Sequence, residues 1–152
     1  MADDHTEPNY SKFQANYFFN CPNEPACGAA FDKMMNNPDI KEQNFEAALS
    51  RITLQGNTNI THSINFYYKS AERFEAAEKL FSSSPAFGVF SQEMAAAGAE
   101  PYYNNLTSYL ITEGDGRGAN YGVTFVSDVN DPVVYFNAFK KMSSKMFKES
   151  FG

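Results

Sequence analysis

Short strand patterns rich in aromatic residues alternate with helical patterns rich in Ala along this chain, and this alternation constrains the fold most. The clearest strand covers residues 60–69, where apolar and polar side chains alternate. A helix is predicted over residues 71–81, and a second helical segment over residues 86–97. Because these patterns follow one another directly in the chain, we expect the strands and helices to pack against each other in one domain.

The remaining elements follow from the same periodicities and from Pro, Gly and Asn clusters that end them. We expect strands around residues 17–19 and over 45–54, 103–112 and 121–127, and helices over 25–35 and 132–146. The order is therefore strand, helix, strand, strand, helix, strand, followed by one extra strand and helix. This order predicts an α+β fold, with an antiparallel sheet and helices packed mainly on one face.

Aromatic residues supply the core volume that Leu, Ile and Val are too few to provide. The chain has 152 residues with fifteen Phe, nine Tyr and no Trp. That length suits one domain, which we place at residues 13–152, after a flexible acidic arm at residues 1–12. A Gly-rich stretch at residues 114–118 is expected to be a hairpin turn. The arm has no apolar stretch typical of a secretion signal, so a cytoplasmic location is predicted.

Charge and hydropathy exclude several classes of partner. The net charge is −6, with twelve Lys and Arg against eighteen Asp and Glu. An acidic chain without a basic cluster is not expected to bind nucleic acid or anionic membranes. No apolar run is long enough to cross a bilayer. Cys21 and Cys27 are six residues apart; a disulfide between them is possible, but in a cytosolic chain we expect both to stay reduced.

The order strand, helix, strand, strand, helix, strand resembles the ferredoxin-like fold. Within it, the aromatic strand, the Ala- and Phe-rich helix and the sequence Ser-Pro-Ala-Phe at residues 84–87 resemble the dimeric α/β-barrel superfamily. This resemblance covers roughly residues 13–113. The superfamily includes antibiotic-biosynthesis-type monooxygenases, small polyketide cyclases, muconolactone-type isomerases and stress-responsive barrel proteins. It implies a homodimer whose sheets pair face to face, with small molecules bound between helices and sheet.

Alternation along the strands sorts side chains onto two faces of the expected sheet. The face without helices is expected to be polar and aromatic, and its strand residues are Asn16, Phe18, Asn20, Arg51, Thr53, Asn65, Tyr67, Thr107, Tyr109 and Thr124. Aromatic walls with a few hydrogen-bonding groups suit a small-molecule pocket. An alternative is a dimer interface, in which these polar groups pair across the two chains.

Six residues are the candidate site. Arg51 is expected to hold a carboxylate or enolate, and Tyr67 and Tyr109 to donate hydrogen bonds to a developing oxyanion. The resemblance to polyketide cyclases implies His62 as a base, with Tyr67 or Tyr68 as its orienting partner. The resemblance to the monooxygenases implies roles for Asn16 and Asn65, although the Trp frequent in those sites is absent.

Two classes of function are compatible with these residues. One is a small-molecule-binding protein or cofactor-independent enzyme, of monooxygenase, cyclase or isomerase type, acting on a small aromatic or polyketide-like compound. The other is a non-catalytic assembly subunit that uses its aromatic sheet face as an interface. No motif for flavin, nicotinamide or a metal occurs, so no cofactor is predicted.

Overall fold

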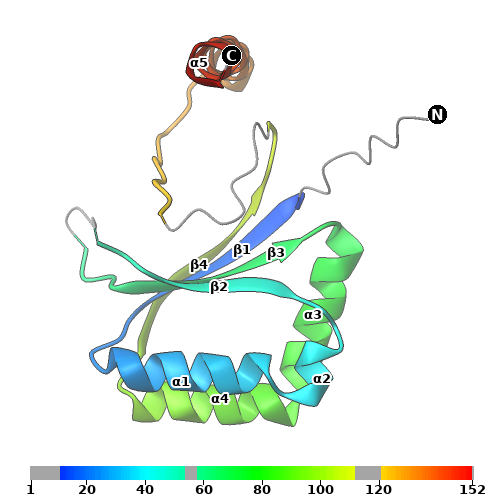
Figure 1. Cartoon of the computed structure of the whole chain (residues 1–152), viewed down its shortest axis with the longest axis vertical. Coiled ribbons are helices and arrows are strands. Elements are labelled where there is room, and N and C mark those ends of the chain that lie inside the picture. The colour runs from blue at the N-terminus through cyan, green and yellow to red at the C-terminus, as the bar shows by residue number, and fades with distance from the viewer. Residues whose placement is uncertain (1–10, 54–57, 112–120, 152) are drawn as a thin grey trace. The chain divides into compact units, whose positions relative to one another are not determined.

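In the computed structural model, four antiparallel strands form one sheet in the order β2-β3-β1-β4 (Figure 1). Their bounds are β1 Phe13–Asn20, β2 Glu46–Arg51, β3 His62–Tyr68 and β4 Glu100–Ser108. The structure describes residues 11–53, 58–111 and 121–151. The predicted turn at 114–118 and most of the predicted arm at 1–12 lie outside these residues. With β1 and β3 at the centre, the topology confirms the predicted ferredoxin-like α+β fold.

The helices of this unit lie on one face of the sheet, as Figure 1 shows. They are α1 Glu24–Met35, α2 Pro38–Lys41, α3 Ala71–Ser83 and α4 Pro85–Ala96. Side chains cap their N-termini: Asn23 accepts from the backbone of Ala26, and Ser70 from that of Arg73. The short α2 was not predicted, because Asn-Asn-Pro at residues 36–38 indicates the end of the preceding helix and no new one. Its Pro38 instead begins the new helix.

Aromatic rings fill the space between the sheet and the helices, as the composition predicts. Phe66 of β3 is 3% exposed and contacts the rings of Tyr17, Phe45, Tyr68 and Phe81. Edge-to-face and tilted arrangements of this kind add to the free energy gained by burial alone. The core is therefore concentrated beneath β1 and β3, and it fixes the face on which each of their side chains lies.

Residues 110–152 form a second compact unit, distinct from the unit of residues 1–109. Its helix is α5, Pro132–Phe151, whose first turn is capped by Asp131 through the backbone N–H groups of Val133 and Val134. The predicted C-terminal helix is confirmed, but the strand predicted over residues 121–127 is wrong, since those residues form no strand. The single domain expected over 13–152 stays a prediction.

Candidate functional site

The six predicted site residues fall into two groups, on opposite faces of the sheet. His62 and Arg51 lie on the face that the helices cover, directly opposite each other on β3 and β2. The other four, Asn16, Asn65, Tyr67 and Tyr109, have strand positions that place them on the other face, which we call the open face. His62 and Tyr67 are on opposite faces of β3, so the structure does not bring these two together. The alternative partner, Tyr68, shares the face of His62 but lies at the other end of the strand.

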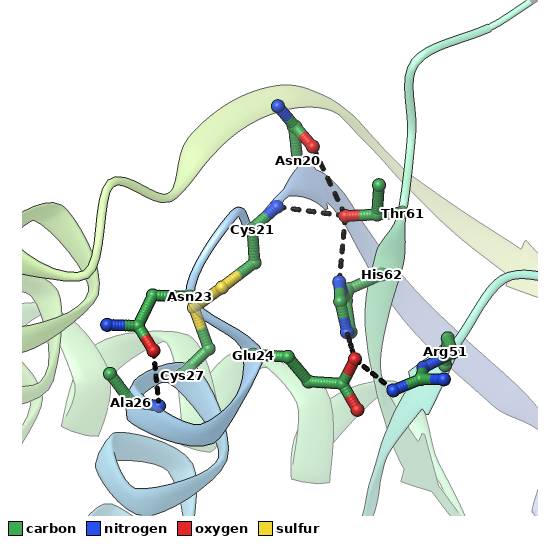
Figure 2. Close-up of a disulfide and its surroundings, with 9 residues drawn as sticks. All are labelled: Asn20, Cys21, Asn23, Glu24, Ala26, Cys27, Arg51, Thr61 and His62. Atoms are coloured by element: carbon green, nitrogen blue, oxygen red, sulfur yellow. Dashed lines mark hydrogen bonds and ion pairs between the residues drawn. A yellow bond between two sulfur atoms is a disulfide. The ribbon is translucent and has the colours of Figure 1, made fainter.

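A carboxylate from α1 joins the two residues of the helix side. Oε2 of Glu24 accepts a hydrogen bond from Nη2 of Arg51, and the same oxygen lies 3.5 Å from Nε2 of His62 (Figure 2). The Arg51 and Glu24 side chains are largely exposed, whereas His62 is 3% exposed. The Arg51 guanidinium lowers the pKa of the Glu24 carboxyl, mainly through this hydrogen bond.

The expected position of Arg51 on the open face beside Tyr67 is therefore wrong, whereas its role in holding an anion stays a prediction. A strand over residues 45–54 with Ile52 on the core side puts Arg51 on the open face by simple alternation. In the structure, β2 ends at Arg51, and its pairing with β3 places Ala47, Leu49 and Arg51 on the helix side. A change of one residue in phase moves a side chain to the other face of a sheet.

The other ring nitrogen of His62, Nδ1, contacts the side chain of the preceding residue, Thr61. Oγ1 of Thr61 lies 2.8 Å from Nδ1 of His62, and it also accepts the backbone N–H of Cys21 at 2.9 Å. The imidazole stacks on Phe19, with ring centroids 5.7 Å apart. Nε2 has no hydrogen-bond partner among the described residues. His62 is thus enclosed by the fold, and Figure 2 shows its ring aimed at Glu24.

A disulfide between Cys21 and Cys27 lies beside this cluster and joins the end of β1 to α1 (Figure 2). The expectation that both cysteines stay reduced is wrong for this structure. Their Cα atoms are 6.8 Å apart, within the span that a disulfide bridges, because the β1–α1 connection turns back on itself at Pro22. The bond holds the first turn of α1, and with it Glu24, against the end of β1.

The open face carries a row of three asparagines across adjacent strands. Asn65 of β3, Asn16 of β1 and Asn105 of β4 are directly opposite one another. Nδ2 of Asn16 donates to Oδ1 of Asn105 at 2.7 Å, and Asn65 donates to Ser63 at 3.2 Å. Asn16 and Asn65 are only 7% and 8% exposed, whereas Asn105 is exposed. The row therefore presents ordered amide groups rather than mobile surface side chains.

Aromatic side chains flank this amide row on both sides. On one side, Phe18 stacks on Tyr103 with ring centroids 4.5 Å apart. On the other, Gln14 lies opposite Tyr67 and accepts a hydrogen bond from the Tyr109 hydroxyl. Burial, and then the charge of Glu46, raises the pKa of Tyr67, and burial, Tyr67 and Glu46 raise that of Tyr109. Both hydroxyls are consequently protonated hydrogen-bond donors at neutral pH.

The charged strand residues of the open face are acidic. Glu46 lies opposite Tyr67, and Glu100 lies opposite Asn20. With Arg51 on the helix side, β1 to β4 carry no Lys or Arg on this face among their described residues. Lys12, just before β1, accepts the Tyr109 N–H through its backbone oxygen at one end of the face. The strand residues around Asn16 therefore suit neutral groups better than anions.

Sequence reasoning missed three residues that complete these two clusters. Asn105 shares its phase with Thr107 and Tyr109, so strand alternation alone would have found it. Gln14 falls before the strand that was recognised, which began too late. Glu24 has no local signal, because only the folded β1–α1 connection brings it to His62 and Arg51.

No three His, Cys, Asp or Glu side chains in the described part of the chain are placed to hold a metal ion. None of its helices is long and apolar enough to cross a membrane. No known protein family and no curated protein matches the sequence.

Two solved structures resemble the chain. A dimeric ferredoxin-like protein from an uncultured marine organism matches 68% of this chain and 99% of its own, at 15% identity and a TM-score of 0.49. HapK from Hahella chejuensis matches 74% of this chain and 99% of its own, at 15% identity and a TM-score of 0.43.

Proposed function

We propose that the open face of the sheet binds a small, uncharged aromatic or polyketide-like molecule. The observation that carries this proposal is the row of Asn65, Asn16 and Asn105 between two groups of aromatic side chains. Flat rings bind a planar ligand by stacking and by excluding water, whereas amides fix its orientation through hydrogen bonds. The row offers both donors and acceptors, so it suits carbonyl and hydroxyl groups on the same ligand.

The same geometry favours binding over acid–base catalysis. A general base must lie within hydrogen-bond reach of the proton that it removes. His62 lies on the helix side of β3 and is 3% exposed, so it does not reach a molecule on the open face. The tyrosine hydroxyls of that face are donors at neutral pH, because their pKa values are raised. They orient a ligand but do not accept its protons.

An NMR titration with two probes of similar shape and different charge tests this proposal. The neutral probe is 1-acetonaphthone, and the anionic one is 1-naphthoate. We expect the neutral ketone to shift the side-chain NH₂ signals of Asn65 and Asn105, with weaker binding of the carboxylate because of Glu46 and Glu100. Shifts confined to the helices, or equal binding of both probes, would remove the support for this face as the site.

Assembly is the competing role for the same face. Tyr103 is 44% exposed although it stacks on Phe18, and an exposed aromatic pair is also typical of a contact between protein chains. In a homodimer through this face, the Asn65 and Asn105 amide signals depend on protein concentration without any probe. Such a dependence, with no response to 1-acetonaphthone, would favour the assembly role.

A further inference from the structure

Strand β4 is an edge of the sheet. Its protecting features, Glu100, Pro101 and an irregularity in the pairing with β1, are confined to its start, and the rest of the strand has no charge or proline. It pairs only with β1 in the sheet order, and its residues are exposed along its whole length. No charged residue occurs between Pro101 and Leu110. Tyr103 and Leu106, whose strand positions put them on opposite faces, are 44% and 47% exposed. A long, uncharged, partly apolar edge is a template for pairing with another strand.

The opposite edge of the sheet differs in each of these respects. Strand β2 has six residues, with charged side chains at both ends, Glu46 and Arg51. Arg51 is further engaged by Glu24. Charges at a short edge discourage the approach of another strand, because they would lose their hydration without gaining partners. The asymmetry points to β4, not β2, as the edge that takes an additional strand.

The backbone N–H and C=O groups on the side of β4 away from β1 are placed to pair with another strand. Tyr109 donates its N–H to the backbone oxygen of Lys12, on the side of β1. Backbone groups alternate in direction along a strand, so the N–H and C=O of Asn104, Leu106 and Ser108 are directed to the free side. Within the described part of the chain these backbone groups have no partner, so the three residues provide an unpaired antiparallel ladder at the outer edge.

We propose that β4 pairs with β4 of a second copy of this chain, antiparallel and about a two-fold axis at Leu106. In that register Leu106 meets its own copy, Asn104 lies opposite Ser108, and Tyr103 lies opposite Tyr109. Each outward ladder group then finds a partner, and the two four-stranded sheets join into one continuous sheet.

The strand itself argues for a second copy as the occupant. A two-fold contact places identical segments together, which is unfavourable when they carry like charges. Here the paired segment is uncharged, and the axis brings two exposed Leu side chains into contact. Tyr103 of each copy lies opposite Tyr109 of the other, so the two-fold axis creates this aromatic pair twice. This contact leaves Asn16, Asn65 and Tyr67 uncovered, so it does not depend on the proposed ligand-binding function.

Sedimentation equilibrium of the full chain tests the proposal, with two pairs of matched variants. Leu106→Lys places two cations at the axis, and Val89→Lys adds the same charge at an exposed position of α4. Asn104→Pro removes one outward N–H, whereas Asn104→Ala keeps it. We expect a dimer of the 17.0 kDa chain. Its dissociation constant should rise by about tenfold or more in Leu106→Lys and Asn104→Pro, and stay unchanged in the two controls.

Circular dichroism and a thermal melt show whether each variant still folds, so a lost dimer is not confused with a lost fold. If Asn104→Pro does not fold, the comparison of Leu106→Lys with Val89→Lys tests the interface. A wild-type monomer from micromolar to submillimolar concentration would overturn the proposal. So would a dimer that survives Leu106→Lys and Asn104→Pro but is lost in Phe18→Asp, since that result assigns the interface to the open face. Protected Asn104 and Leu106 amides in a monomer would show that another part of the same chain covers this edge.

Discussion

Nε2 of His62 lies 3.5 Å from Oε2 of Glu24, the carboxylate oxygen that also accepts a hydrogen bond from Arg51. One surface carboxylate thus connects the first turn of α1 with the ends of two strands. An exposed ion pair alone contributes little to stability. Its significance here is positional, because it places a carboxylate beside the buried imidazole and engages Arg51, which the register of β2 against β3 puts on the helix side.

The first prediction concerns the titration of Glu24. Because Arg51 is the main cause of the lowered pKa of this carboxyl, Arg51→Gln should move that pKa up toward the usual value of about 4.3. A carboxyl with a lowered pKa in the folded state stabilises the protein above its unfolded pKa, and this contribution is lost as the pH falls through the folded pKa. The variant should therefore lose less stability on acidification. Carbon-detected NMR of the Glu24 carboxyl gives the pKa.

A matched control for this titration is Lys33→Gln. Lys33 belongs to the same helix and pairs with Glu93 of α4, away from Glu24. This change should leave the Glu24 titration where it is. An equal effect of both substitutions would show that general charge, and not the Arg51 contact, lowers the pKa.

The second prediction concerns the disulfide. Replacing Cys21 and Cys27 together by Ala should lower the free energy of unfolding by about 2 kcal/mol, as expected for the loss of a short closed loop. Urea denaturation of the oxidised wild type and the double variant measures the difference. Reduced wild type should fall near the variant. Two reactive thiols in freshly purified, denatured protein would contradict the presence of the bond.

The third prediction concerns the aromatic core. Phe66→Ala removes the ring that four other rings contact, and should cost about 3–5 kcal/mol of unfolding free energy. Phe125→Ala is the control, because Phe125 is 91% exposed and its truncation should change stability little. Denaturation midpoints measured side by side test the pair. Similar losses in both variants would mean that Phe125 is also buried against other residues in solution.

Sequence alternation predicted the fold well where strands have neighbours, and poorly where they do not. The pattern at 60–69 contains β3, a central strand whose apolar positions all meet the core. Residues 121–127 show a similar pattern, yet Tyr121, Val123 and Phe125 are 90%, 72% and 91% exposed and no strand forms. Periodicity reports which side chains share a face, but a strand also needs a partner to take its backbone hydrogen bonds.

The candidate site was also predictable only in part, because strand register and loop geometry depend on the folded chain. Asn16, Asn65, Tyr67 and Tyr109 were placed on one face correctly, because β1, β3 and β4 follow simple alternation. The Arg51 position depended on the end of β2 and its register against β3, which a single sequence does not encode locally. The pairing of the two cysteines was misjudged from compartment, although the geometry of the β1–α1 connection decides it.

The last prediction separates the hydroxyl of Tyr67 from its ring. Tyr67 is half-buried on the open face, opposite Gln14 and Glu46, and its ring does not fill the helix-side core. Tyr67→Phe should change the free energy of unfolding by about 1 kcal/mol or less, since one hydrogen-bonding group is lost. The affinity for 1-acetonaphthone should fall by about tenfold, because the ketone loses a donor from a partly buried group. Calorimetric titration of wild type and variant measures this loss. Because the pKa of Tyr67 is raised, wild-type affinity should stay constant from neutral pH to above the usual tyrosine pKa of about 10.

Tyr17→Phe is the matched control for the Tyr67 prediction. The Tyr17 hydroxyl donates to Glu78 of α3 on the helix side, so its removal should leave the affinity unchanged. If Tyr17→Phe weakens binding as much as Tyr67→Phe, the ketone binds on the helix side of the sheet. If Tyr67→Phe has no effect, the hydroxyl takes no part in binding.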